Sequence, residues 1–96
     1  PYLGVYLRDL SSELADYLGI ISTKGTLVAD IMPGSPADKA GIKAGDIILE
    51  INGMTINNST DLTEKISKMS VGQKVELKIM RDKKTITVNV TLAEKP

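Results

Sequence analysis

The sequence predicts an α+β domain, built as a partly open antiparallel β-barrel capped by helices. Short runs of apolar and β-branched residues recur along the chain, and glycine, proline or asparagine separates them. The clearest strand pattern lies near the C-terminus, where Ile86, Val88, Val90 and Leu92 alternate with polar residues. Only residues 59–69 carry a helical pattern longer than about two turns. Many short strands with one fuller helix are typical of such a barrel.

The length favours a single domain. The chain has 96 residues, which is within the usual size of one domain. We assign residues 1–93 to this domain and the polar end, Glu94-Lys95-Pro96, to a C-terminal linker. Because the first motif follows almost directly after Pro1, we expect the domain to come from a longer protein.

The first predicted elements are a strand over residues 4–8 and a short helix. Ser11 can cap this helix, because its hydroxyl can accept a hydrogen bond from a free amide of the first turn. Gly19 can end the helix in the left-handed conformation. The apolar positions of the helix are Leu14, Tyr17 and Leu18. We expect this stripe to pack on the core.

A loop over Ile20–Gly25 and a strand over Gly25–Met32 come next. The segment that follows predicts a second short helix. Ser35 stands at the N-cap position, and Pro36 stands at the first helical position, where its missing N–H costs nothing. Gly41 follows the last turn and closes this helix.

A hairpin is predicted after the second helix. Residues 42–46 form a tight turn, and Ile47–Ile51 reads as a buried strand. Asn52-Gly53 is a strong signal for a hairpin turn, and Met54–Ile56 is the short returning strand.

The last helix is predicted to begin where Asn58 paired with Asp61, or Ser59 alone, can cap it. Its apolar stripe is Leu62, Ile66 and Met69. A half-exposed strand over Val75–Ile79, a polar turn and the alternating strand over residues 85–92 complete the chain.

The composition excludes several classes of function. Lys plus Arg and Asp plus Glu both number 12, so a net charge of zero gives no electrostatic support for binding nucleic acid. The sequence holds no histidine and no cysteine, which excludes Ser–His–Asp and Cys–His catalysis, disulfides and thiolate zinc sites. No apolar run is long enough to span a membrane.

The remaining catalytic patterns are weak. No serine marks a pocket for Ser–Lys chemistry. A carboxylate pair such as Asp30 with Glu50 is better interpreted as solvated charges at strand ends. The glycines at 34, 41 and 45 lack the Gly-Lys-Ser/Thr ending of a phosphate-binding loop. We therefore predict a domain that is not itself an enzyme and that uses no cofactor or metal.

A binding site is predicted at the start of the chain. The stretch Tyr2–Arg8 reads as a glycine-containing loop that becomes a strand. Consecutive backbone amides in a loop can cradle an anion, and a strand with an unpaired edge can accept an extended peptide as an added strand. With the helix over residues 59–69 opposite, the two features suggest a pocket for a peptide that ends in a free carboxylate.

The segment 33–53, Pro-Gly-Ser-Pro-Ala-Asp-Lys-Ala-Gly-Ile-Lys-Ala-Gly-Asp-Ile-Ile-Leu-Glu-Ile-Asn-Gly, closely resembles the central motif of bacterial PDZ domains. Tyr2-Leu3-Gly4-Val5 resembles the carboxylate-binding loop of PDZ domains in HtrA/DegP-type serine proteases. The helix around residues 14–19 resembles the short helix that those domains place after the binding strand. The resemblance covers nearly the whole chain.

The resemblance implies a set of site residues. The amides of Leu3, Gly4 and Val5 would bind the ligand carboxylate, beside Tyr2. The peptide-pairing strand and the groove would use Tyr6, Leu7, Arg8, Ser59, Leu62, Thr63, Ile66 and Met69. By pattern alone Val5, Leu7, Leu62 and Ile66 are expected in the core, and only their placement beside the loop makes them groove candidates. Helical spacing puts Ser59, Thr63 and Ile66 on the groove side, with Leu62 and Met69 deeper or at the end. Arg8 is expected to face water. No histidine stands at the start of the last helix, so we expect selection of an apolar C-terminal residue rather than of a ligand hydroxyl.

The resemblance also implies a function for the parent protein. The domain would capture the C-termini of unfolded, substrate or activator polypeptides for a covalently linked serine protease domain. The implied location is the cell envelope, in the bacterial periplasm or at the extracytoplasmic face. Two alternatives stay open. The domain could belong to a carboxy-terminal processing protease, or it could be a purely structural assembly module whose groove is closed.

Overall fold

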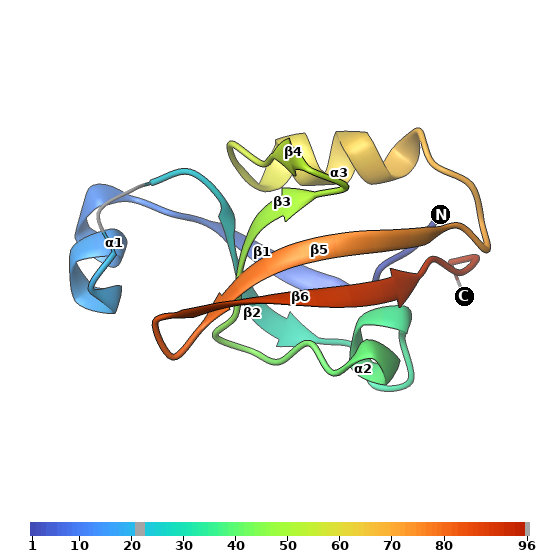
Figure 1. The fold of residues 1–96 in the computed structure, drawn as a ribbon, viewed down its shortest axis with the longest axis horizontal. Coiled ribbons are helices and arrows are strands. Elements are labelled where there is room, and N and C mark those ends of the chain that lie inside the picture. The colour runs from blue at the N-terminus through green and yellow to red at the C-terminus, as the bar shows by residue number, and fades with distance from the viewer. Residues whose placement is uncertain (21–22, 96) are drawn as a thin grey trace.

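The computed structural model of the chain describes residues 1–20 and 23–95. Within these residues the strands form one antiparallel sheet in the order β1-β2-β3-β5-β6, with β4 paired to β3 (Figure 1). The strands are β1 (Val5–Asp9), β2 (Thr26–Ile31), β3 (Ile47–Ile51), β4 (Met54–Thr55), β5 (Lys74–Arg81) and β6 (Lys84–Thr91). The helices are α1 (Ser12–Leu18), α2 (Pro36–Ala40) and α3 (Ser59–Ser67). The elements follow the predicted order.

The sheet curls so that its two edge strands approach each other at one end. An isolated antiparallel bridge pairs Tyr2 with Ala93, and the Ala93 amide donates to the Tyr2 carbonyl at 3.3 Å. The two ends of the chain therefore lie close together (Figure 1). This arrangement confirms the predicted α+β domain with a partly open antiparallel barrel.

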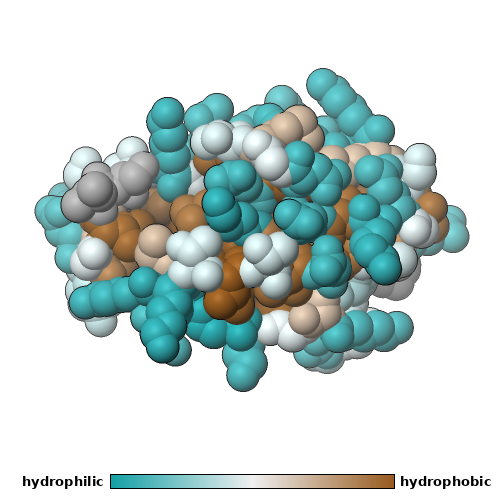
Figure 2. Space-filling view, viewed as in Figure 1, coloured by the Kyte–Doolittle hydropathy of each residue, from teal (hydrophilic) through white to brown (hydrophobic). Residues whose placement is uncertain are grey.

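The core fills the inside of the curled sheet. β3 supplies Ile47, Ile48 and Ile51, and β5 alternates between buried and exposed residues, as predicted. The fully buried large side chains of the core also include Val28, Ile56, Leu62, Leu77, Ile79, Val90 and Leu92. Figure 2 shows one face of the molecule covered mostly by hydrophilic side chains, with apolar residues visible between them. None of the described helices is long and apolar enough to cross a membrane.

The predicted packing of α1 is wrong, although its ends are right. Ser11 Oγ accepts from the Leu14 amide at 3.1 Å, and Gly19 ends the helix with φ of +74°. However, Tyr17 is 87% exposed, and within α1 only Ala15 is buried. α1 lies in the connection between β1 and β2, away from the body of the sheet (Figure 1). Its apolar stripe therefore has little of the sheet to pack against.

The loop expected before β2 is only partly described. Of Ile20–Gly25, residues 21 and 22 lie outside the described residues. The strand that follows is β2, one residue shorter at each end than the predicted Gly25–Met32.

α2 has the predicted caps. Ser35 Oγ accepts from the Asp38 amide at 3.2 Å, and the Asp38 carboxylate accepts from the Gly34 amide at 2.8 Å. The amide of Ala37, in the first turn, donates to the carbonyl of Leu3 at 2.9 Å. α2 therefore anchors the start of the chain as well as the segment around it.

Candidate functional site

Residues 2–4 form a loop whose carbonyls are bonded inward while two of its amides stay free. The Leu3 carbonyl is held by Ala37, and the Gly4 carbonyl accepts from the Met32 amide at 2.9 Å. Within the part of the chain that the structure describes, neither the Leu3 amide nor the Gly4 amide donates a hydrogen bond. Adjacent free amides of this kind can bind an anion without a charged side chain.

Gly4 is required by the shape of this loop. Its φ is +89°, a conformation that other residues rarely adopt. A Cβ at this position would lie 2.1 Å from the Cβ of Ser35. The loop can therefore pack against the N-terminus of α2 only because residue 4 has no side chain.

β1 continues the loop and is an edge strand. Among the described residues it pairs with β2 and with no strand on its other side, and Val5 lies opposite Ile31. Hydrogen bonding alternates along an antiparallel strand, and the Gly4 carbonyl points to β2, so the Val5 amide points to the unpaired side. The free amides of the loop are thus followed by an open backbone edge.

A groove runs between the unpaired side of β1 and α3, and it consists of two adjoining hollows. The inner hollow, about 380 Å³, begins at loop 2–4. The outer hollow, about 450 Å³, lies beside the first turns of α3. Val5, Tyr6, Leu7 and Thr63 line both hollows. The groove is therefore continuous from the free amides along β1.

α3 begins at a side-chain cap. The Asn58 side chain accepts from the Asp61 amide at 2.8 Å, and the Asp61 carboxylate accepts from the Asn57 amide at 2.9 Å. Of the predicted capping residues, Asn58 is thus the one that caps the helix. Hydrogen bonds from Lys65 and from the Asn57 amide hold the pKa of Asp61 below its usual value.

The first turn of α3 is also tied to the strands. Asp9, the last residue of β1, accepts from the Ser59 amide at 2.8 Å. The hydroxyls of Ser59 and Thr26 lie 2.6 Å apart, and the Thr26 hydroxyl also donates to the carbonyl of Arg8 at 3.3 Å. These contacts hold α3 at a fixed distance from β1 at the far end of the groove.

We expect the contact between Asp9 and Ser59 to respond to pH. Hydrogen bonds from the Ser59 hydroxyl and amide hold the pKa of Asp9 below its usual value. Because the folded-state pKa is the lower one, the contact contributes stability above about pH 4, and this contribution is lost as the pH falls through the folded-state pKa. In NMR spectra recorded from pH 6 to pH 2, the Ser59 amide should titrate with a midpoint below about 3.9.

Asp9→Asn should remove this titration, whereas Asp16→Asn, the same change at an exposed residue of α1, should leave it in place. A Ser59 amide that titrates with an ordinary aspartate midpoint, or that does not titrate, would contradict the contact.

The structure brings together most of the predicted site residues. Those that line the groove are Tyr2, Leu3, Gly4, Val5, Tyr6, Leu7, Ser59, Thr63 and Ile66. Arg8, Leu62 and Met69 line neither hollow. Leu62 is fully buried in the core, Arg8 faces solvent, and Met69 lies beyond the end of α3, where it packs against the core.

Several groove residues were not predicted from the sequence. Ser67 lies one helical turn after Thr63, and Thr60 and Glu64 lie next to predicted positions on the same helix face. Helical spacing was the available signal for these three. Lys95 also lines the inner hollow, although it falls in the predicted linker. No local pattern indicates this, because the pairing of Tyr2 with Ala93 is what places it there.

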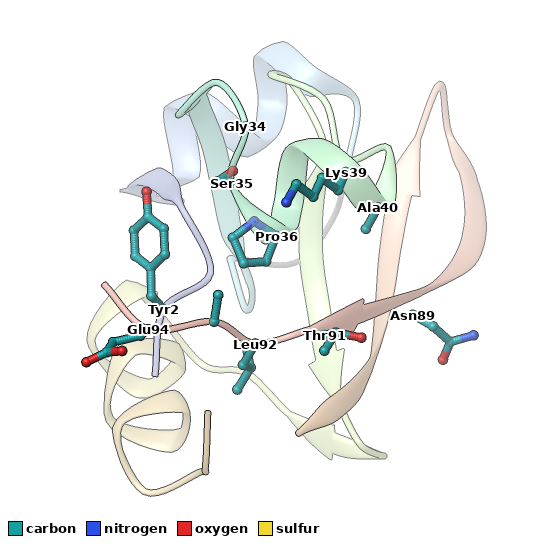
Figure 3. A pocket seen from close by; sticks show the side chains of 11 residues that line it. Tyr2, Gly34, Ser35, Pro36, Lys39, Ala40, Asn89, Thr91, Leu92 and Glu94 are labelled. Carbon is teal, nitrogen blue, oxygen red and sulfur yellow. The ribbon is translucent and has the colours of Figure 1, made fainter. Parts of the chain in front are cut away.

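A further hollow of about 590 Å³ lies on another face, between α2 and the end of the sheet (Figure 3). Tyr2 and Glu94 stand at one end of it and Asn89 at the other, with Pro36 and Lys39 of α2 along one side. α2 already packs against β6 here, so this hollow does not follow an open strand edge as the groove does. Among the described residues, no group of three or more acidic side chains could hold a metal ion.

A family model for the PDZ domain matches residues 1–92 of the chain. The sequence is 43% identical over 95 residues to a probable periplasmic serine endoprotease DegP-like of Marinomonas sp. (strain MWYL1), covering 99% of this chain and 20% of that protein. It is 41% identical over 92 residues to the periplasmic serine endoprotease DegP of Salmonella typhimurium, covering 96% of this chain and 19% of that protein. The chain thus spans about a fifth of the length of these relatives.

Solved structures with the same fold include peptide complexes. The HtrA-type protease AlgW with a decapeptide superposes with a TM-score of 0.88 at 27% identity, over 99% of this chain and 29% of that one. The HtrA3 PDZ domain bound to a phage-derived ligand superposes with a TM-score of 0.80 at 26% identity, over 94% of this chain and 82% of that one.

Proposed function

Because the chain belongs to the PDZ domain family, we propose that its groove binds the C-terminal segment of an extended polypeptide, which adds as a strand beside β1. The observation that carries this proposal is the pair of free amides of Leu3 and Gly4 at the head of an open strand edge. A terminal carboxylate there would accept hydrogen bonds from both amides and from Val5. Such charge-assisted bonds are the stronger ones in proteins.

The charge of the inner hollow supports a carboxylate ligand. Lys95 is the only residue with a charged side chain among the described residues that line it. The other side chains that line it are apolar or hydroxyl-bearing, with Val5, Leu7 and Ile66 as the apolar floor. The last side chain of the ligand would lie on this floor, so an apolar C-terminal residue is preferred. We expect a dissociation constant of roughly micromolar order, because a short peptide loses conformational freedom on binding.

We further propose that the domain serves a DegP-like serine endoprotease. Its relatives carry that name, and the chain spans about a fifth of them, so the protease activity would reside in another part of the protein. In this role the domain is not catalytic. It would present the C-termini of unfolded, substrate or activator polypeptides to a covalently linked protease domain. The location would be the periplasm, because the relatives are named periplasmic endoproteases. A closed, purely structural groove has less support, because both hollows along β1 are open to a ligand.

The test is an NMR titration of the 96-residue chain with one apolar-ended peptide, prepared either as the free acid or with an amidated C-terminus. The free acid should shift the amides of Leu3, Gly4 and Val5 together with those of α3. Amidation should weaken binding at least about tenfold, because a hydrogen bond to a charged group contributes roughly 1.5–3 kcal/mol. Equal binding of the two peptides, or shifts confined to another face, would contradict carboxylate capture.

A further inference from the structure

We propose that the outer hollow selects a cationic side chain, lysine or arginine, at the third residue from the C-terminus of the ligand. The inference deepens the proposed function and rests on it. It follows from the register of strand addition, from the hydrogen bonds that the hydroxyls of α3 already make, and from the charge of Glu64.

The register places this ligand residue in the outer hollow. With the terminal carboxylate at Leu3 and Gly4, an antiparallel ligand strand enters beside Asp9 and ends with its C-terminus in the inner hollow. Successive side chains of a strand point to opposite faces and rise about 3.3 Å each, so the last and third-last side chains both face α3, about 7 Å apart. The last one lies in the inner hollow, and the third-last one reaches the outer hollow beside Thr63.

Two hydroxyl groups of this wall, those of Ser59 and Thr63, have already used their hydrogens. Thr63 Oγ1 donates to the Ser59 carbonyl at 3.0 Å. The Ser59 hydroxyl has two acceptors within reach, Thr26 Oγ1 at 2.6 Å and the Asp9 carboxylate. A hydroxyl carries one hydrogen and two lone pairs, so both groups face the ligand as acceptors. The hydroxyl of Thr60 can rotate to donate or to accept, and it does not oppose this preference.

Glu64 gives the outer hollow its charge. It is the only residue with a charged side chain among the described residues that line this hollow, and within the described part of the chain its carboxylate makes no ion pair. Arg8 lies on β1 but lines neither hollow, and the nearby Lys65 is paired with Asp61. A cationic ligand side chain would therefore meet an unpaired carboxylate and acceptor hydroxyls.

The two hollows also have opposite charges. Lys95 lies in the inner one and Glu64 in the outer one. A ligand with a terminal carboxylate and a cationic third-last residue presents the complementary order of charges. Leu7, which lines both hollows, offers an apolar surface for the methylene groups of a lysine or arginine.

The experiment uses two apolar-ended peptides that differ only at the third-last residue, lysine or glutamate, each as free acid and as amide. Binding to the 96-residue chain is measured at low ionic strength. We expect the lysine peptide to bind about three- to tenfold more tightly than the glutamate peptide. The reason is that lysine forms one exposed ion pair with Glu64, whereas glutamate is repelled by it. Glu64→Gln should reduce this ratio and Glu64→Lys should invert it. Glu13→Lys on α1, with the same change in net charge, should leave it unchanged.

The outcomes separate this inference from the proposed function. A preference for the free acid with no lysine preference, or a lysine preference that survives Glu64→Lys, overturns the inference alone. Equal binding of acid and amide overturns carboxylate capture, and with it the register on which the inference rests.

Discussion

Gly4→Ala is expected to lower the free energy of unfolding by about 2–4 kcal/mol. Two costs add at this position. An alanine must adopt the glycine φ of +89°, and its Cβ would lie 2.1 Å from the Cβ of Ser35, which belongs to a buried N-cap residue and cannot swing aside. Relief of the collision requires a shift of the loop or of α2. The expected result is therefore a lower midpoint in urea denaturation, with weaker peptide binding in the folded fraction.

Gly34→Ala is the matched control. Gly34 has a φ of +76° but nothing within 4 Å of its missing Cβ, so only the conformational cost of about 1–2 kcal/mol applies. The double variant Gly4→Ala/Ser35→Gly removes the collision with the Ser35 side chain. Glycine in place of serine at an N-cap costs only about a few tenths of a kcal/mol of stability. It should therefore be more stable than Gly4→Ala alone. Equal losses in Gly4→Ala and Gly34→Ala would show that contact with Ser35 is not the cause.

Arg81→Met is the second large effect, with an expected loss of about 2–3 kcal/mol. Asp46 is 2% exposed, and Arg81 donates to its two carboxylate oxygens from Nε at 2.9 Å and from Nη2 at 2.7 Å. Nη2 also donates to the Gly41 carbonyl at 2.8 Å, and the contact with Asp46 raises the pKa of Arg81 above its usual value. Without the guanidinium, the Lys43 amide is the only donor that the buried carboxylate keeps among the described residues.

The loss should fall below that of a fully buried pair, because the Arg81 side chain is 29% exposed and water can enter when it is removed. Lys78→Met is the control. It breaks an ion pair with Glu50 of 3.4 Å in which both side chains are about a third exposed or more, so it should change stability by less than about 0.5 kcal/mol. A double-mutant cycle of Arg81→Met with Asp46→Asn should show strong coupling. Additive losses would contradict a direct stabilising contact.

Much of the fold follows from local signals. The predicted element order is the observed one, and the caps at Ser11, Ser35, Gly19 and Gly41 lie where the sequence places them. These features depend on neighbouring residues, because a capping hydroxyl reaches an amide three positions away and a glycine ends the helix it follows. The loop at Leu3-Gly4 was predicted for the same reason, as a glycine directly before an apolar strand.

Helical spacing placed Ile66 on the groove side of α3 and Leu62 deeper, and in the structure Ile66 lines the groove while Leu62 is fully buried in the core. The same kind of reasoning failed for α1, whose apolar stripe was expected on the core but leaves Tyr17 in solvent. A pattern shows that a face is apolar, but the position of the element on the sheet determines what that face covers.

The sequence by itself therefore determined the class of the domain, the position of the glycine loop at the head of β1 and the absence of histidine and cysteine chemistry. Only the tertiary structure decided the width and the charge of the groove. Asp9 holds Ser59 across 50 positions of the chain, and the pairing of Tyr2 with Ala93 brings Lys95 to the loop. The physical reason is that these contacts join segments with no local relation to each other, so they exist only after the sheet has curled and brought its ends together.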